Sequence, residues 1–456
     1  MDALERVFIP LDEIVDPDVN PVIVALAKRA GLPVDVAITA VRIAMNKRYA
    51  TEAEMESEVL VVGPLAGWRV RRVKGGGKVY ELRWPSGFRA VWRAPEKFLS
   101  LPLEERVNVL GDVIVVRAVE RGGRFEVEEL RSLRTRSDPD ALAALAQTDE
   151  ARHLRDAGLA PEAAAAALLL AEPRSLDAAA SLALRLALLS VRGLVHVAEW
   201  SRKAVLKSTT FRLAEAYLRW WHLTGERPSL ATLIGDARTG VSRLAGVDGV
   251  AFDEIGSWRK SSRADDEGFW SAIRSGLTNG IWKRARGGEK SIEIQRMLPT
   301  YWAGNPTEAP LGETPPREHT RLWLRRQGLD AEELDAMLSR YAVFWGVTDQ
   351  SVSDELLATL RMNVYPAPGV VRAYAEYVRA AQRRPLPVPQ RCELHDRELV
   401  AYRNVSGVFR AVFADEKAAA MLACAAVRGV LTLPPSPATA ELLERLGGGD
   451  GDAGGA

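Results

Sequence analysis

Five short apolar runs, separated by segments of helical character, restrict the fold of this sequence more than any other feature. They lie at residues 194–197, 230–235, 247–252, 298–303 and 342–347. Strands that alternate with helices favour a parallel sheet covered by helices on both faces. We therefore predict an α/β domain over residues 191–365, with any ligand site at the carboxyl ends of its strands.

The segments outside this core predict further domains. Apolar residues at helical spacing on either side of Gly31-Leu32-Pro33 indicate a small helical module over residues 1–55. Aromatic and β-branched residues, with glycine turns at 75–77 and 122–123, indicate four or five short strands and a small β-barrel over residues 56–135. Alanine-rich helices follow at 136–190, further helices at 366–446 and a glycine-rich flexible tail at 447–456. The predicted fold class is multidomain α/β.

Charge and cysteine content exclude several classes of protein. The 456 residues carry a net charge of +1, so a site for DNA or another polyanion must be local. Cys392 and Cys424 are too few for a disulfide framework or a four-cysteine zinc site, so we expect no zinc and a reducing, cytoplasmic compartment. Charged residues interrupt the apolar stretch at 161–190, and no membrane partner is expected.

The segment Val247–Ile255 carries the sharpest chemical signal. Its apolar strand ends in two adjacent carboxylates, Asp253 and Glu254, which is the Walker B arrangement. In that interpretation Asp253 holds Mg²⁺ through water, and Glu254 polarises a water molecule aimed at the γ-phosphate of ATP. The alternative is that the two carboxylates only cap the next helix.

Further motifs follow in an order that resembles the AAA+ domain of the MCM replicative helicases. Asn305 ends the next strand, Leu338-Ser339-Arg340-Tyr341 precedes another, and Arg403 and Arg410 stand seven residues apart near the end. The resemblance covers about residues 177–446. It implies a sensor-1 role for Asn305, an arginine finger at Arg340 and a sensor-2 arginine at Arg403, with residues 366–446 as a helical lid. It also implies a ring, a hexamer of this chain or one shared with other MCM subunits.

Two further regions resemble DNA-binding parts of the same family. Residues 107–116 and 122–130 look like the last two strands of the OB-fold in the MCM amino-terminal domain. OB-folds bind single strands by stacking and basic grooves, roles that Trp68, Arg69 and Arg71 would fill. Strand alternation also predicts that at least two of Trp68, Trp84 and Trp92 belong to the core.

The segment at residues 280–297 resembles the pre-sensor hairpin of the ring channel. Its tip carries Lys283, Arg284 and Arg286, which would contact DNA phosphates. The alternative interpretation is a solvated surface hairpin.

The phosphate-binding loop departs most from the MCM pattern. No glycine lies between Gly193 and Gly225, although a Walker A loop uses glycines to close its backbone around phosphate. One register places Lys203 at the lysine position, and a shift by four places Lys207 and Ser208 there. The bulky side chains of Trp200, Val205 and Leu206 and the charge of Glu199 are expected to oppose binding of a triphosphate.

These observations leave three functions. The first is an MCM-like DNA-binding ring subunit of DNA replication whose own-site ATP hydrolysis is impaired or lost because its Walker A is degenerate. The alternative is an active ATP-dependent DNA helicase with ATP and Mg²⁺ as cofactors. A more remote possibility is a related ring ATPase of phage-defence systems.

Overall fold

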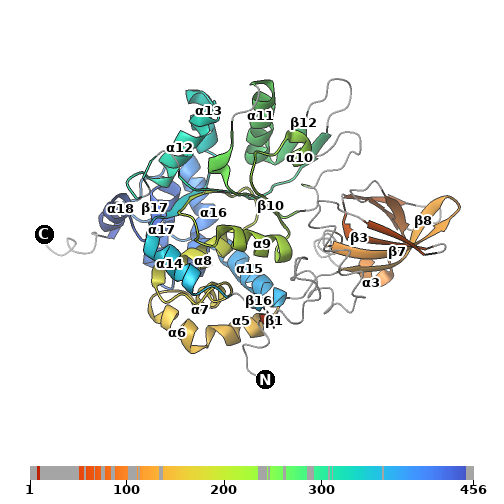
Figure 1. Ribbon diagram of the computed structural model, residues 1–456, viewed down its shortest axis with the longest axis horizontal. Coiled ribbons are helices and arrows are strands. Elements are labelled where there is room, and N and C mark those ends of the chain that lie inside the picture. Colours follow the sequence, from red (N-terminus) through yellow and green to blue (C-terminus); the bar gives the residue numbers. More distant parts are fainter. Residues whose placement is uncertain are drawn as a thin grey trace.

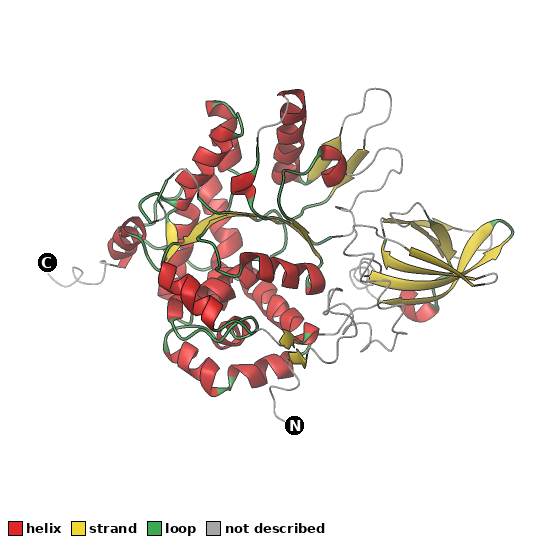
Figure 2. Cartoon of the chain, in the orientation of Figure 1, coloured by secondary structure: helices red, strands yellow, loops and turns green. Residues whose placement is uncertain are grey.

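The computed structural model has a mixed α/β architecture with two large sheets (Figures 1 and 2). The described residues are 8–10, 51–55, 58–65, 67–72, 78–83, 88–100, 110, 113–132, 137–234, 244, 247–259, 263–284, 292–306, 309–310, 312–361 and 364–447. The helices expected between residues 20 and 50, the 73–77 turn and the tail from residue 448 lie outside them.

A six-stranded parallel sheet forms the centre of the α/β domain, as predicted. Its strands, in spatial order, are β10 (Trp220–Leu223), β11 (Gly249–Phe252), β14 (Thr300–Gly304), β9 (His196–Trp200), β15 (Val343–Val347) and β17 (Leu431–Leu433). Every neighbouring pair in this order is parallel. The carboxyl ends of β11, β14 and β9 therefore meet at one edge, where a ligand site is expected.

Two of the strand assignments differ from the sequence prediction. The run expected as a strand at 230–235 begins a short helix, α10 (Leu230–Ile234), and the edge strand is β10. Aromatic residues dominate β10 and fit a pleated, buried surface, whereas Ser229 accepts a hydrogen bond from Thr232 at the start of α10, as an N-cap residue does. β17 adds a strand inside the region predicted to be purely helical.

Helices cover both faces of this sheet, and the strands alternate between the two layers. Val197, Tyr301 and Val343 belong to one buried cluster with the alanine-rich helices, whereas the next residues along each strand, Ala198, Trp302 and Phe344, belong to the other. The first layer contains α5 (Pro139–Ala146), α6 (Asp149–Asp156), α7 (Pro161–Ala167), α8 (Leu176–Leu188), α9 (Lys207–Tyr217), α14 (Gln350–Ala358), α15 (Pro368–Gln382), α16 (Asp396–Val412), α17 (Glu416–Arg428) and α18 (Pro437–Gly447). The second contains α10, α11 (Arg263–Asn279), α12 (Pro316–Arg326) and α13 (Ala331–Leu338), and the 3-10 helix η4 (Ile255–Ser257) follows β11.

A seven-stranded sheet forms the second unit. Its order is β2 (Thr51–Met55), β3 (Glu58–Pro64), β7 (Val113–Arg121), β8 (Arg124–Ser132), β6 (Arg89–Trp92), β5 (Lys78–Arg83) and β4 (Gly67–Arg72). The pair β6–β8 is parallel and the others are antiparallel. Gly122 and Gly123, with φ of 60° and 74°, make the two-residue turn between β7 and β8 that the sequence predicts. The sheet already begins at Thr51, inside the range expected to be helical.

Two further pairs of short strands lie outside the two large sheets. β1 (Phe8–Pro10) pairs antiparallel with β16 (Val364–Pro366), immediately before α15. The hairpin of β12 (Ile281–Arg284) and β13 (Ile292–Gln295) stands beside α11, at the place predicted for the basic hairpin (Figure 1).

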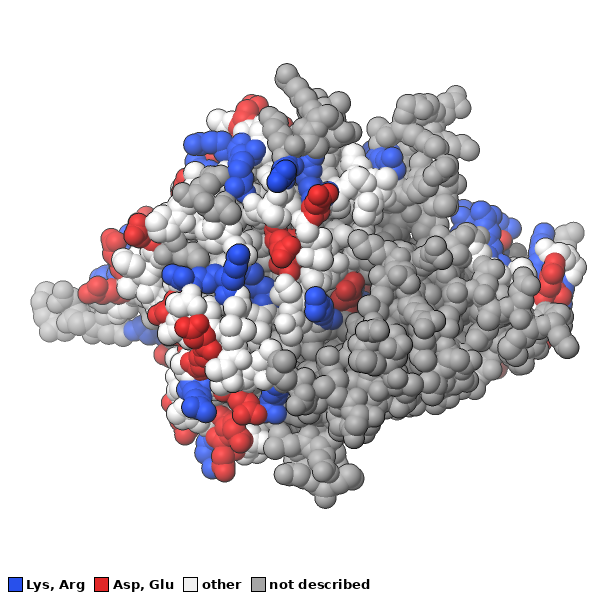
Figure 3. Space-filling view, in the orientation of Figure 1, with Lys and Arg blue, Asp and Glu red and all other residues white. Residues whose placement is uncertain are grey.

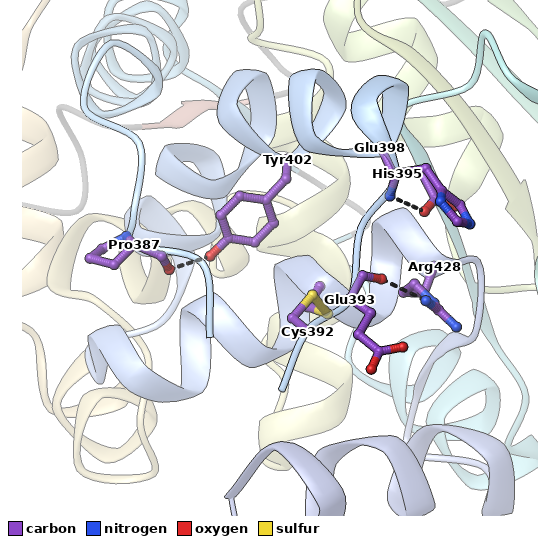
Figure 4. The surroundings of a disulfide bond; sticks show 8 residues. Pro387, Cys392, Glu393, His395, Glu398, Tyr402 and Arg428 are labelled. Atoms are coloured by element: carbon purple, nitrogen blue, oxygen red, sulfur yellow. Dashed lines mark hydrogen bonds between the residues drawn. A yellow bond between two sulfur atoms is a disulfide. The ribbon is translucent and has the colours of Figure 1, made fainter. Parts of the chain in front are cut away.

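A disulfide joins Cys392 to Cys424, an outcome that the count of two cysteines does not predict. Its Cα atoms are 6.3 Å apart, and it fastens the loop before α16 to α17. The loop is also held where Tyr402 Oη donates to Pro387 O at 2.8 Å and Arg428 Nη1 donates to Glu393 O at 2.6 Å (Figure 4). The two thiols are therefore not free in this structure.

Among the described residues that Figure 3 shows, lysine and arginine side chains are interspersed with aspartate and glutamate side chains. This distribution agrees with the net charge of +1. In the described part of the chain, no helix combines the length and the apolar character that a bilayer crossing requires.

Candidate functional site

The segment between β9 and α9 turns back sharply although it contains no glycine. Ala204 and Leu206 have φ of 65° and 59°, in the left-handed region, which costs roughly 1–2 kcal/mol for each such residue. The N–H groups of residues 203–206 have no hydrogen-bond acceptor among the described residues. Alternating hand and open N–H groups ahead of a helix make a concave anion-binding turn. The segment is a closed loop and not a plain helix start.

The bulky side chains expected to obstruct this loop point away from it. Val205 and Leu206 are buried in the core beside α8, and burying a leucine contributes about 1.5–3 kcal/mol, enough to offset the strain at residue 206. The indole of Trp200 lies on the other side of the sheet, where its Nε1 donates to Thr320 Oγ1 at 2.9 Å. The obstruction expected from these three side chains is absent because all three are buried, whereas Lys203 and Ala204 of the same loop are exposed.

Lys207 lies at the end of this loop and is the first residue of α9. Its Nζ donates to Asn305 Oδ1 at 2.6 Å and to the carbonyl oxygens of Ser201 and Arg202 at 3.1 and 3.2 Å. Burial lowers the pKa of Lys207 to about 8, although the nearby charge of Glu199 opposes this effect. Lys203 is exposed on the loop. The structure thus brings Lys207, and not Lys203, to the side chain that follows β14, and a phosphate-binding role for Lys207 and Ser208 stays a prediction.

Asp253 and Ser208 meet directly beside the loop. Ser208 Oγ donates to Asp253 Oδ2 at 2.6 Å, and His222 Nε2 of β10 lies 3.3 Å from the same oxygen. Burial alone would raise the pKa of Asp253, but the hydrogen bonds from His222 and Ser208 outweigh it and hold the pKa below its usual value. Asp253 is 1% exposed, and it is an ionised group at the carboxyl edge and not part of an apolar interior.

Glu254 and Asn305 complete this edge of the sheet. Glu254 is exposed, with φ of 59°, and its N–H donates to Asp253 Oδ1 at 2.9 Å. That left-handed turn directs the two adjacent carboxylates apart, so that one is buried and one reaches solvent. Asn305 follows β14 and faces Lys207, which agrees with the position expected of it.

Glu199, expected to repel a triphosphate, does not face the loop opening. It is fully buried in an ion pair with Arg185 of α8, in which Arg185 Nη2 lies 2.8 Å from Glu199 Oε1. Arg185 outweighs the effect of burial and lowers the pKa of Glu199, so the carboxylate is ionised and its charge is compensated. The charge that was expected to repel a triphosphate is therefore compensated within the protein.

Arg340 lies in a pocket of about 460 Å³ that also contains His196, Arg397 and Asn404. Its Nε donates to Thr278 Oγ1 at 2.6 Å, and its guanidinium also donates to Ala336 O. Burial, together with the charges of Arg274 and Arg397, lowers the pKa of Arg340.

This pocket lies at the amino-terminal ends of the strands, and the loop lies at their carboxyl ends. His196 begins β9 and lines the pocket, whereas the loop follows Trp200 at the end of β9, about 13 Å further along the strand. Arg340 is half-exposed there and is accessible to another molecule.

Arg403, the expected sensor-2 residue, lies exposed on α16 and is not among the residues that line this pocket. Arg397, one and a half turns earlier on α16, does line it, and its Nη1 donates to Ser339 Oγ at 2.6 Å. The arginine that accompanies Arg340 is therefore Arg397.

The residues predicted to contact DNA are distributed over both units. Lys283 on β12 is exposed and ion-paired with Glu293 at 3.7 Å. Arg284 ends the same strand, and Arg286 lies outside the described residues. The hairpin itself is confirmed, and its contact with DNA stays a prediction.

In the seven-stranded sheet the tryptophans serve mainly the core. Trp92 is buried, and Trp68 is half-buried against the same core; Trp84 lies outside the described residues. Arg69 is exposed, and Arg71 is ion-paired with Glu81 at 3.1 Å. Arg69 is thus the more accessible cation, and Trp68 offers only part of its ring for stacking.

The metal expected at this site is Mg²⁺, which proteins seldom bind with side chains alone. The described residues contain no group of three or more histidine, cysteine, aspartate or glutamate side chains that could hold an ion. Mg²⁺ in phosphate sites is held by one or two protein oxygens, waters and the phosphates themselves. Asp253 and Ser208 supply such oxygens side by side.

Comparisons with known proteins leave the family open. No protein family model matches the chain. A stretch of 172 residues, 37% of this chain, is 31% identical to the uncharacterized protein ORF425 of Acidianus filamentous virus 2 and covers 38% of it. A stretch of 112 residues, 24% of this chain, is 30% identical to the uncharacterized protein ORF426 of Acidianus filamentous virus 1 and covers 25% of it. The chain thus matches less than two-fifths of the length of these curated relatives.

Sequence reasoning missed three residues of this arrangement: Arg185, His222 and Arg397. Each lies far along the chain from the motif it contacts, and a lone arginine or histidine inside a helix or strand carries no spacing signal. The strand Trp220–Leu223, which contains His222, was itself not predicted. Only the pairing of β10 with β11 brings His222 to Asp253.

Proposed function

We propose that the chain is a subunit of an MCM-like AAA+ ring that binds Mg·ATP at the loop between β9 and α9 and acts on DNA. One observation carries this proposal: a loop with open N–H groups ends at Lys207, and Ser208 beside it contacts the carboxylate of Asp253. A lysine for phosphate and a hydroxyl paired with a strand-end carboxylate for Mg²⁺ are the parts that P-loop ATPases use.

The strand order supports the AAA+ part of the proposal. Counted along the chain from β9, the central parallel strands lie in the order 2-3-4-1-5, with β17 added beside the fifth. This order places the loop of the first strand between the ends of the fourth and fifth, and Ser201 and Arg202 donate there to Gly304 O and Val347 O. The proposed sensor-1 residue, Asn305, follows the fourth strand.

The OB-fold part of the proposal rests on the second sheet. When the strands β4 to β8 are numbered 1 to 5 along the chain, their order in the sheet is 1-2-3-5-4. Strands 3 and 5, which are β6 and β8, are parallel, and the helix α3 (Glu96–Leu99) follows strand 3. β3, which directly precedes β4 in the chain, pairs with β7, the fourth strand. If β3 and β4 are two halves of one bent first strand, that strand pairs with the strands at both ends of the sheet, β7 and β5. A small Greek-key barrel closes in this way.

A site completed between subunits is supported by the position of Arg340. It lies at the end of the sheet opposite to the loop of its own chain, and in this proposal it serves the loop of a neighbour. In AAA+ rings such an arginine stabilises the charge that develops on the γ-phosphate. We place Arg397 beside it in the same role.

Hydrolysis at the chain's own site is the version that the geometry favours over an inactive one. Glu254 is exposed at the carboxyl edge, where it can orient a water molecule toward a γ-phosphate. The test is calorimetric binding of Mg·ATP followed by a DNA-stimulated ATPase assay. Glu254→Gln should preserve binding and lower turnover by about 10²–10⁴-fold, whereas Lys207→Ala should abolish binding. An unaltered protein that binds no nucleotide at millimolar Mg·ATP would remove the proposal.

A second candidate is the ring subunit with an impaired own site. The strained, glycine-free backbone at Ala204 and Leu206 favours it, because any relaxation of that strain opens the loop. Such a subunit would still supply Arg340 to a neighbour. It predicts assembly without nucleotide and no turnover alone, and robust ATP hydrolysis by the isolated chain would exclude it.

DNA binding is proposed at the β12–β13 hairpin. A variant with Lys283, Arg284 and Arg286 all changed to alanine should lower the slope of log affinity against log salt by about 2 for single-stranded DNA. The matched control removes three exposed cations, two on helices and one at the C-cap of α15: Arg152, Arg325 and Arg383. Equal slopes in the two variants would show that the hairpin does not contact the strand.

A further inference from the structure

A loop that lacks glycine needs another means to hold its shape. Behind it lies a buried ion pair between Arg185 of α8 and Glu199 of β9, both 0% exposed. Arg185 Nε and Nη2 donate to the two carboxylate oxygens at 2.9 and 2.8 Å, a bidentate arrangement.

This pair contacts the loop at both of its ends. Arg185 Nη1 donates to Val205 O at 2.9 Å, immediately between the two left-handed residues. At the other end, Ser201 Oγ donates to Glu199 Oε1 at 2.7 Å and accepts from Val347 N at 2.9 Å. The ion pair thus ties the first and the fifth residue of the turn to the same rigid helix and strand.

Two further groups fix the orientation of the carboxylate. Tyr301 Oη donates to Glu199 Oε2 at 2.6 Å, and Trp345 Nε1 donates to Tyr301 Oη at 2.9 Å. The guanidinium of Arg185 also lies 5.3 Å from the centre of the Trp345 ring. Every polar group of the network therefore has a partner, which keeps its geometry unique.

Stability by itself does not account for this network. A buried ion pair loses the hydration of two charges, and replacement of such pairs by apolar residues of similar size is often neutral or stabilising. A buried pair that hydrogen-bonds a strained loop is better explained by the position that it imposes on that loop.

We propose that the Arg185–Glu199 pair is a positioning device that holds the glycine-free turn from Ser201 to Leu206 in its anion-binding shape. It does for this loop what glycines do in a Walker A loop: it makes the left-handed conformations of Ala204 and Leu206 persist. The identity of the anion, a Mg-bound nucleoside triphosphate, rests on the proposed function, whereas the shape of the empty loop does not.

The test combines removal of the pair with restoration of glycine. Arg185→Met with Glu199→Gln removes both charges together. The amide oxygen can accept from one of the two hydroxyls, that of Tyr301 or Ser201, and the amide NH2 can donate to the other. We expect this variant to melt near the unaltered protein and to bind Mg·ATPγS at least about tenfold more weakly. Adding Ala204→Gly, at the exposed one of the two left-handed residues, should then recover affinity by at least about fivefold, because glycine adopts positive φ without strain.

The matched control is Tyr374→Phe, which removes a buried hydrogen bond to Ala183 O on the same helix, α8, without contact with the loop. Its affinity should not change. Unchanged affinity in the Met/Gln variant, or no recovery when Ala204→Gly is added, would overturn the proposal, since a merely structural defect would not respond to glycine in the loop.

Hydrogen exchange separates this proposal from the proposed function. The N–H groups of Ser201 and Arg202 donate to Gly304 O and Val347 O in the protein without nucleotide. Their exchange should quicken at least about tenfold in the Met/Gln variant and stay unchanged in Tyr374→Phe. Should the unaltered protein bind no nucleotide, this readout still decides: equal exchange in the two variants refutes the positioning role.

Discussion

The lowered pKa of Lys207 predicts how nucleotide affinity depends on pH. A lysine must be charged to bind a triphosphate, and in the free protein half of the Lys207 side chains are neutral at pH about 8. Bound phosphate stabilises the charged form, so the complex keeps its proton while the free protein loses it. The dissociation constant should therefore double near pH 8 and rise about tenfold between pH 7 and pH 9. A lysine of ordinary pKa, about 10.4, would change affinity by only a few per cent over the same interval.

The assay is calorimetric titration of the unaltered protein with Mg·ATPγS at half-unit steps from pH 7 to pH 9.5, a range in which the Mg-bound nucleotide does not titrate. Lys203→Ala serves as the matched control, because Lys203 is exposed on the same loop and makes no contact with the phosphate position in this register. The control should reproduce the full pH profile of the unaltered protein.

Two results would refute the reasoning. A dissociation constant that is constant to pH 9.5 would show that Lys207 is not the titrating phosphate ligand. A profile that flattens in Lys203→Ala and persists in Lys207→Met would assign the lysine position to the other register.

Other consequences of the structure can be measured independently. Burial lowers the pKa of His196 to about 4, so between pH 6.5 and pH 4 this side chain binds a proton in the unfolded chain but not in the folded protein. The free energy of unfolding should therefore fall by up to about 3 kcal/mol over this interval. In urea titrations, His196→Gln should remove that part of the loss. Reduction of the Cys392–Cys424 disulfide, which closes a loop with a sequence separation of 32, should lower the free energy of unfolding by about 3–4 kcal/mol, and a midpoint unmoved by dithiothreitol would contradict the bond. In the assembled ring, Arg397→Ala should lower ATP turnover at least about tenfold and Arg403→Ala should not; the reverse ranking would restore the role expected of Arg403.

Local pattern was enough to predict much of the α/β core. The apolar runs predicted as strands at 194–197, 247–252, 298–303 and 342–347 overlap β9, β11, β14 and β15, because buried parallel strands are short apolar runs bounded by polar residues. The place of Asp253 and Asn305 followed from their position after such strands. The same signal failed at 230–235, since a short apolar run does not distinguish a strand from a helix.

Only the tertiary structure decided the backbone shape of the loop between β9 and α9 and the charge around it. From the sequence, the absence of glycine and the presence of Glu199 argued against an anion site, because residue type fixes the intrinsic cost of a left-handed backbone and the sign of a charge. Whether the strain of the left-handed residues is offset depends on contacts between different elements of the fold. Arg185 of α8 compensates the charge of Glu199 and donates a hydrogen bond to Val205 O, and the side chain of Leu206 is buried in the core. The sequence determined which residues stand at the edge of the sheet, and packing determined that they form a closed, charged and accessible site.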